Sequence, residues 1–402
     1  MPALEAGGRE PRPAPEPAPP IRWIAGAAEW ASFAPRLHGC RTLALDVEAD
    51  GFHRYPERLA LLQLALPDDH PTIVDPLAYS DLPELGRVLA DPSCQKLIHA
   101  ASYDLRSLQR DLDFTVRGLY DTAIAAQFLG LERTGLAAVL GEVLGLDFNK
   151  SKRLQRMDWS LRPLPADAVA YAASDVAHLC RLAAALQARI AALGREDWVA
   201  EECSRLEQVP ADAMATPDEA CLQLKGARDL DDRGRAILRA LLLYREREAL
   251  RLGRPPYRVL SNAVLLSLAA EPGQRLEQVA GLGRSYLGPR RRDLLACIAA
   301  GRQAPPLPWP RRGPGPRWTP VHRQRLEALK AWRDQSAAQL GLAAGTVWSA
   351  KHLDQLALHP RMSPEALDRG AERDGLPWVR NWQWRTLGDS LGELLRQLDR
   401  PA

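Results

Sequence analysis

The chain has 402 residues, of which 46% are apolar and 26% charged, a composition typical of globular proteins and enough for two or three domains. We find no apolar run that approaches the roughly 20 residues of a membrane helix, and residues 1–20 lack the apolar centre of a secretory signal, so a disordered Pro/Ala-rich tail is expected there. The six Cys are scattered without a C-x-x-C pair, which argues against a zinc site and favours reduced thiols in a cytoplasmic protein.

The net charge of +3 is unevenly distributed along the chain. Residues 1–205 carry 22 Lys and Arg against 28 Asp and Glu, a net charge of −6, whereas residues 206–402 carry 31 against 22, a net charge of +9. An acidic front half suits metal-binding carboxylates, and a basic back half suits a polyanionic partner. Two differently solvated surfaces would give the same imbalance, so charge alone does not decide between these interpretations.

Residues 21–205 alternate short apolar runs with helical patterns, which is typical of an α/β domain. Strands are expected at residues 41–48, 58–66, 72–75 and 96–99. Helices are expected at residues 82–89, 103–112, 122–129, 136–144 and 166–193. This order of elements predicts a mixed β-sheet flanked by helices.

From about residue 209 only helical patterns occur, and they contain an internal repeat with an offset of 88 residues. Tyr244-Arg245-Glu246 matches Trp332-Arg333-Asp334, and Leu252-Gly253 matches Leu340-Gly341. The repeat predicts two small all-α domains, at residues 206–302 and 320–402, the second more divergent than the first. A Pro/Arg/Trp-rich linker at residues 303–319 joins them.

Acidic side chains recur at the ends of the predicted elements. Asp46 and Glu48 follow an apolar run, and residues two apart on a strand point to the same face. Asp104 lies where a strand gives way to a helix, and Tyr171 and Asp175 stand one helical turn apart on one face. Paired carboxylates beside a core are costly, and a divalent cation is a common reason for them.

This combination of residues suits phosphodiester hydrolysis. Two metal ions that clamp the attacking and leaving oxygens need several acidic ligands from different elements. A Tyr one turn from a ligand Asp is well placed to orient the attacking water, by hydrogen bonding or as a base. Each motif taken alone is more often an ordinary strand end or a solvated helix face, so the prediction depends on all of them together.

Two further groups of charged residues have competing interpretations. Asp121 precedes a predicted helix, and Asp is a good helix N-cap, so we expect a cap there rather than a metal ligand. Lys150, Lys152, Arg153 and Arg156 form a basic run ahead of the Tyr171 helix. A solvated loop and a nucleic-acid phosphate contact are about equally expected for this run.

At this point the chain resembles a known family. Its three acidic motifs are similar to the three exonuclease motifs of the DEDDy 3′→5′ exonucleases: Asp46-x-Glu48, His99-Ala-Ala-Ser-Tyr-Asp104-Leu and Tyr171-x-x-x-Asp175. A segment ahead of the third motif is closely similar to ribonuclease D: Lys150-Ser-Lys-Arg, Asp158-Trp159 and Arg162-Pro-Leu. The helical repeats resemble HRDC domains (helicase and RNase D, C-terminal).

The resemblance implies a fold, an activity and a set of site residues. It implies a ribonuclease H-like exonuclease domain over residues 21–205 that removes 3′-terminal nucleotides from RNA, tRNA precursors included, and releases nucleoside 5′-monophosphates. It also implies two divalent cations, Mg²⁺ or Mn²⁺, held by Asp46, Glu48, Asp104 and Asp175, with Tyr171 positioning the attacking water.

The chain differs from the family at one position of the first motif, and two alternative functions remain open. Many relatives carry Phe where this chain has Ala49, so a ring available for stacking on the terminal base is missing here. The same chemistry serves a single-stranded DNA 3′→5′ exonuclease, and the same fold suits a non-catalytic nucleic-acid-binding protein. The sequence implies neither an organic cofactor nor a membrane partner, and it leaves the oligomeric state open.

Overall fold

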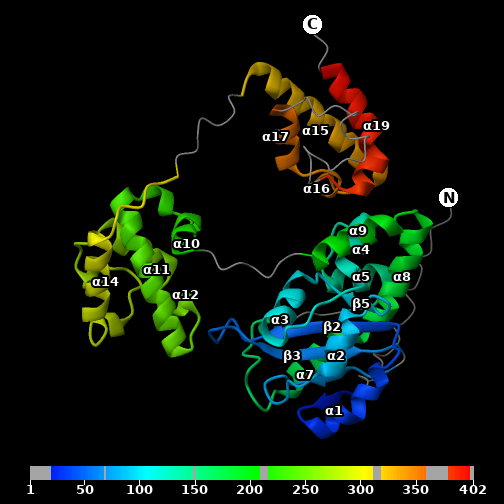
Figure 1. Cartoon of the computed structure of the whole chain (residues 1–402), viewed down its shortest axis with the longest axis horizontal. Helices are drawn as coiled ribbons and strands as arrows, with labels where there is room; N and C mark the ends of the chain where they lie inside the picture. Colours follow the sequence, from blue (N-terminus) through cyan, green and yellow to red (C-terminus); the bar gives the residue numbers. More distant parts are fainter. Residues whose placement is uncertain are drawn as a thin grey trace, which may run out of the picture.

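The computed structural model describes residues 20–67, 69–147, 151–208, 216–310, 318–358 and 379–398. All but the last residue of the expected tail 1–20 therefore lies outside the described residues, as does Lys150 of the basic run. The described chain forms an α/β part followed by two helical parts (Figure 1).

The α/β part is built on a six-stranded sheet with the order β1-β4-β3-β2-β5-β6. The antiparallel pairs are β2 with β3 and β3 with β4, and the other neighbours are parallel, so the predicted mixed sheet is confirmed. β1 and β6 were not predicted, because Arg22-Trp-Ile and Leu119-Tyr-Asp lack the run of β-branched residues, Thr72-Ile-Val, that marks the equally short β4. The strands are β1 (Arg22–Ile24), β2 (Thr42–Ala49), β3 (Leu59–Ala65), β4 (Thr72–Val74), β5 (Gln95–Ile98) and β6 (Leu119–Asp121).

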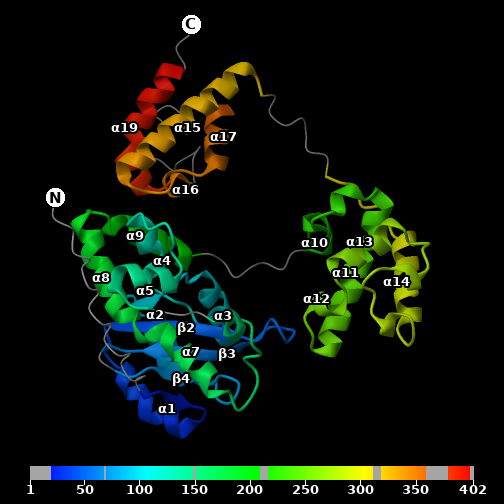
Figure 2. The same ribbon diagram turned by 180° about the vertical axis from the view of Figure 1, so that it is seen from behind.

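Helices cover the sheet, which explains why all seven residues of the central strand β3 are buried. Figures 1 and 2 show α7 on one face and α5 and α8 on the other. The helices of this part are α1 (Ala27–Phe33), η1 (Ala34–Leu37), α2 (Pro83–Ala90), α3 (Ser102–Leu112), α4 (Thr122–Phe128), α5 (Leu136–Leu144), α6 (Lys152–Gln155), α7 (Ala166–Ala177), α8 (Leu179–Ala192) and α9 (Glu196–Glu207).

The expectation of a single helix at residues 166–193 is wrong, because α7 and α8 meet at His178, whose backbone (φ −113°, ψ 0°) leaves the helical region. The stretch Ala166–Ala192 is also apolar enough by composition to span a membrane, with a mean hydropathy of 1.2, contrary to the sequence-based expectation. Half of the most apolar 18-residue window of this stretch is buried within the protein. Buried core helices of globular proteins have this composition, so α7 and α8 are explained by the core they form.

The helical parts follow the repeat seen in the sequence. The first has its own apolar core and comprises α10 (Pro217–Gln223), η2 (Ala227–Asp229), α11 (Asp232–Leu252), α12 (Pro256–Val259), α13 (Asn262–Ala270), η3 (Leu276–Gln278), η4 (Arg284–Tyr286) and α14 (Arg291–Gln303). The second comprises α15 (Pro320–Leu340), α16 (Ala344–Val347), α17 (Ala350–Leu358) and α19 (Asn381–Leu398).

Three consecutive helices of the two parts correspond at the same offset of 88 residues: α11 with α15, α12 with α16 and α13 with α17. The long helix ends in both parts at a glycine with positive φ, 59° at Gly253 and 62° at Gly341. Glycine is favoured there because a left-handed residue closes the last turn without a Cβ clash. The sequence repeat is thus a structural repeat, whereas the exact domain boundaries stay a prediction.

The second helical part is packed against the α/β part through aromatic side chains. The Trp382 ring stacks on Trp198 with a centroid distance of 4.7 Å and meets the Phe128 ring edge-on at 5.2 Å. Glu202 accepts hydrogen bonds from Trp382 Nε1 at 3.0 Å and from Arg380 Nε at 2.9 Å. Residues far apart in sequence therefore share one apolar core here.

Candidate active site

Three acidic side chains converge at the end of β2. Carboxylate oxygens of Asp46, Glu48 and Asp175 lie within 4.8 Å of one another. Asp46 and Glu48 lie on one face of β2, with the buried Val47 between them, and α7 packs against β2 and β3. The register of β2 against β3 shifts at Glu48/Ala49, an irregularity that bends a strand beside the site.

Asp104 borders this cluster from the first turn of α3. Its carboxyl is buried, and its Oδ1 accepts a hydrogen bond from Val47 N at 3.1 Å. Burial is the main cause that raises the pKa of Asp104 to about 7, and the charges of Asp121 and Asp175 act in the same direction. Asp104 is thus close enough to Asp175 to feel its charge, although it is not one of the three acids whose oxygens lie within 4.8 Å.

Tyr171 lies beside the same carboxylates, one helical turn before Asp175 on α7. Only 7% of the residue is exposed. Burial raises the pKa of Tyr171, and the charges of Asp175, Glu48 and Asp46 raise it further. The phenol is therefore protonated at neutral pH, which favours a hydrogen-bonding role over that of a base.

The donor set fits a divalent cation. Hard cations such as Mg²⁺ and Mn²⁺ prefer carboxylate oxygens, and oxygens on opposite sides of one ion are about 4–5 Å apart. The spacing of up to 4.8 Å among the three carboxylates matches this requirement. The residues that the sequence singled out are thus the ones that the structure brings together, with Asp104 at their edge.

The segment between α6 and α7 supports Tyr171 and was not predicted to do so. Gln155 is hydrogen-bonded to the Tyr171 hydroxyl, and the Trp159 ring lies 6.1 Å from the Tyr171 ring. Arg162 fixes this segment to the sheet, because its Nε and Nη2 donate to the two oxygens of Asp75 at 2.5 and 2.6 Å. The signal was present in the Asp158-Trp159 and Arg162 motif, but its structural role requires the fold.

The structure places three of the four predicted RNA-contact residues near this segment. Arg153 pairs with Asp167 in the first turn of α7, and Lys152 and Arg156 are exposed. The carbonyl of Arg156 hydrogen-bonds His53 Nε2 at 2.8 Å. Contact with RNA by these residues stays a prediction.

Asp121 has the structural role expected of it. Its Oδ1 accepts from Ala123 N at 2.8 Å at the start of α4, as an N-cap does. The same carboxylate accepts from the backbone of Ala100 and Ala101 at 2.9 Å, which holds the start of α3. The N-cap interpretation is confirmed.

A mixed sheet that carries clustered carboxylates beside a tyrosine is the arrangement of a metal-dependent nuclease, and the comparisons agree. A family model described as 3′-5′ exonuclease matches residues 21–191, and one described as HRDC domain matches residues 234–298. The curated Ribonuclease D of Gluconacetobacter diazotrophicus is 32% identical over 86% of each chain, and that of Pseudomonas paraeruginosa is 31% identical over 84% of this chain and 90% of that one. The chain belongs to the ribonuclease D family.

A solved structure extends the likeness to nearly the whole chain. It is that of Escherichia coli RNase D, described as an exoribonuclease involved in structured RNA processing, with 25% identity and a TM-score of 0.71. The match covers 94% of this chain and 99% of that one. Together with the family relatives, it identifies this chain as a 3′→5′ exoribonuclease, a hydrolase of RNA with divalent-metal chemistry.

Proposed function

We propose that the cluster at the end of β2 is the catalytic centre, at which Asp46, Glu48, Asp104 and Asp175 hold two divalent cations. The observation that carries this assignment is the convergence of three carboxylates within 4.8 Å beside a buried tyrosine. Bound there, the cations would supply Lewis acidity for the attacking and leaving oxygens. The all-oxygen donor set favours Mg²⁺ or Mn²⁺, and titration of metal-free protein with each ion separates the two.

The chain's own residues position the reactants. The protonated Tyr171 hydroxyl orients a water for attack on the terminal phosphorus, and Gln155 and Trp159 hold the phenol in place. The P–O bond to the 3′ oxygen of the preceding nucleotide breaks, and that oxygen takes up a proton. The products are a nucleoside 5′-monophosphate and an RNA shortened by one residue with a free 3′-OH.

We further propose that the substrate is a tRNA precursor with an unfinished 3′ end, processed in the cytoplasm. The curated relatives are ribonucleases D, and the E. coli homologue acts in structured RNA processing, which supports an RNA with folded upstream parts. The six cysteines are free thiols, which supports a reducing compartment. Competition between RNA and DNA oligomers of the same sequence tests the sugar preference, and equal cleavage of both would favour the DNA alternative.

Loss of a single ligand tests the assignment of the site. We expect Asp46→Ala to abolish hydrolysis of single-stranded RNA while it leaves RNA binding within about twofold of wild type, since Asp46 contributes to the metal site and not to the basic surfaces. Asp81→Ala, which removes an exposed acid outside the cluster, is the matched control and is expected to retain full activity. Hydrolysis that persists in Asp46→Ala contradicts the assignment, and hydrolysis by neither variant nor wild type favours a binding protein.

A further inference from the structure

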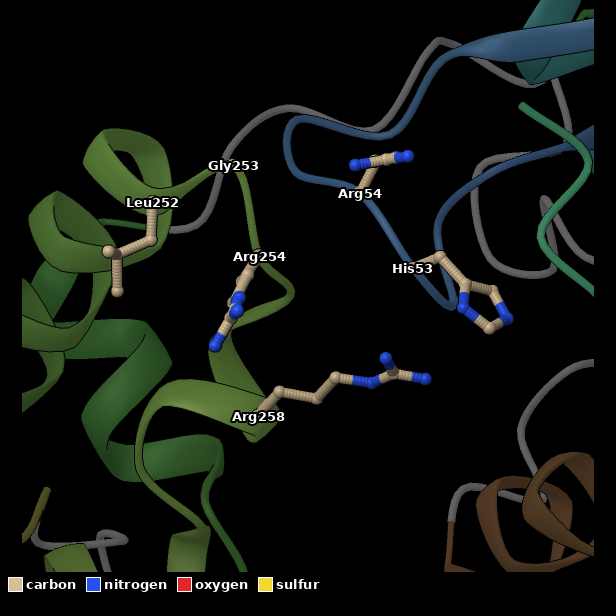
Figure 3. A pocket seen from close by; sticks show the side chains of 6 residues that line it. All are labelled: His53, Arg54, Leu252, Gly253, Arg254 and Arg258. Carbon is tan, nitrogen blue, oxygen red and sulfur yellow. The ribbon is translucent and has the colours of Figure 1, made fainter. Parts of the chain in front are cut away.

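A basic cavity lies between the α/β part and the first helical part. The loop between β2 and β3, the end of α11 and the start of α12 line a half-open cavity of about 660 Å³, within the usual range of ligand sites. Among the described residues that line it, four of six are basic and none is acidic: His53, Arg54, Leu252, Gly253, Arg254 and Arg258. Figure 3 shows His53 and Arg54 on the loop side and Arg254 and Arg258 on the helical side of the same space. We call it the interdomain basic pocket.

Hydrogen bonds between the two parts hold this pocket together. Tyr257 of α12 donates its hydroxyl proton to the carbonyl of Phe52 at 2.9 Å, and the Tyr55 hydroxyl donates to Glu246 of α11. Figures 1 and 2 both show the β2–β3 loop reaching toward α12. The left-handed Gly253 ends α11 and turns the chain into the pocket wall. The cavity is thus built by specific contacts from two parts of the chain.

The guanidinium groups of Arg254 and Arg258 are available to an anion. Both residues are exposed, and neither side chain forms an ion pair with an acid in the part of the chain that the structure describes. By contrast, Arg251 in the last turn of α11 is paired with Glu248 at 2.8 Å. Clustered positive charge in a concavity attracts polyanions, and arginine matches phosphate geometry particularly well.

Two exposed aromatic residues are chain neighbours of pocket-lining residues, Phe52 of His53 and Tyr257 of Arg258. Phe52 and Tyr257 are each 52% exposed, although large apolar side chains are usually covered. The guanidinium of Arg258 lies 5.9 Å from the centre of the Tyr257 ring. Basic groups interleaved with exposed rings are characteristic of single-stranded nucleic-acid sites, where charge holds the backbone and bases stack on the rings.

The pocket also lies close to the carboxylate cluster along the chain. His53 is five residues after Glu48, so the two are at most about 18 Å apart. The bond from His53 to the carbonyl of Arg156 ties the loop to the segment that contacts Tyr171. A strand whose 3′ end occupies the cluster therefore has only a few nucleotides between its scissile bond and the pocket.

We propose that the interdomain basic pocket binds the phosphodiester backbone of the single-stranded RNA a few nucleotides upstream of the 3′ end. This inference rests on the proposed function, because it takes the carboxylate cluster as the point where the 3′ end is cleaved. Arg254 and Arg258 contact phosphates, and Phe52 and Tyr257 offer faces to bases. The pocket binds the upstream part of long substrates, and cleavage takes place at the carboxylate cluster.

The test combines binding and turnover for the full-length variant Arg254→Gln/Arg258→Gln. Binding of a 20-nucleotide RNA in EDTA, measured by fluorescence anisotropy at several salt concentrations, is expected to show a slope of log K against log salt that is smaller by about 1.4, since each lost phosphate contact on a single strand removes about 0.7. KM for the 20-mer with Mg²⁺ is expected to rise, while kcat/KM for a trinucleotide is expected to be unchanged. Arg228→Gln, an exposed arginine of the same helical part outside the pocket, is the matched control.

Phe52→Ala separates stacking from charge, because only the backbone carbonyl of Phe52 bonds Tyr257. This variant is expected to bind the 20-mer at least about fivefold more weakly with an unchanged salt slope. A salt slope and a KM in the double variant equal to those of Arg228→Gln overturn the proposal. Because binding is measured without hydrolysis, failure of the pocket and failure of the catalytic assignment are distinguishable.

Discussion

The Arg162–Asp75 pair is predicted to hold the segment that supports Tyr171, the residue proposed to orient the attacking water. Arg162→Leu removes both hydrogen bonds to Asp75 and those to the carbonyls of Ala60 and Trp159. It leaves the Asp75 carboxylate, whose side chain is only 4% exposed, without its charged partner. The segment between α6 and α7 should then open far more often than in the wild-type protein.

The structure sets the size of this effect. Removing one member of a buried ion pair costs about 3–5 kcal/mol, and since the Arg162 side chain is 27% exposed we expect a cost near the lower end, about 3 kcal/mol. An exposed surface pair would cost less than about 1 kcal/mol. About 3 kcal/mol corresponds to a rise of roughly 100-fold in the opening equilibrium.

Native-state hydrogen exchange on peptides that cover residues 152–164 measures this opening directly. We expect Arg162→Leu to reduce protection there by about 100-fold and kcat on RNA to fall, because Trp159 no longer supports Tyr171. A double-mutant cycle with Asp75→Asn should give a coupling of at least about 1.5 kcal/mol. Protection within a few-fold of wild type, or strictly additive effects, would refute the reasoning.

Three further predictions address Tyr171, the buried Asp104 and the aromatic contact of Trp382. Tyr171→Phe should lower kcat by about 10²–10⁴-fold with an unchanged RNA dissociation constant, measured by single-turnover kinetics and anisotropy. The Asp104 carboxyl binds its proton more tightly in the folded protein than in the unfolded chain. The free energy of unfolding of the metal-free protein, measured by urea titration, should therefore fall as pH rises from about 4 to about 7. This pH dependence should vanish in Asp104→Asn. Mg²⁺ should stabilise the wild type more at pH 8 than at pH 5, since it favours the ionised carboxylate. Trp382→Ala removes a buried ring stacked on Trp198 and should lower the free energy of unfolding, measured by chemical denaturation, by about 3–5 kcal/mol. Removal of an exposed ring would lower it little.

The sequence allowed much of the carboxylate cluster to be predicted, because its geometry is local. Asp46 and Glu48 share a face through the two-residue period of a strand, and Tyr171 and Asp175 share one through the turn of a helix. That α7 packs against β2, and so brings the two pairs together, followed from the family resemblance and not from spacing.

Other features depend on tertiary contacts that no local pattern encodes. The break at His178 interrupts an apolar pattern that continues through it, so a single helix was the natural expectation. Arg162 meets Asp75 across 87 residues, and Tyr257 meets Phe52 across 205. A basic residue in a loop has the same sequence signal whether it faces water, a carboxylate or a pocket, so the role of Arg254 and Arg258 required the fold.

The central claim is metal-dependent removal of nucleotides from the 3′ end of RNA at the Asp175 site. The most direct measurement is a gel time course with a 5′-labelled single-stranded RNA carrying a free 3′-OH, in Mg²⁺, Mn²⁺ or EDTA, beside the Asp175→Asn variant. We predict a ladder that shortens from the 3′ end only with metal and is absent for the variant. An intact RNA band in every lane, with a DNA control also uncut, would contradict the account.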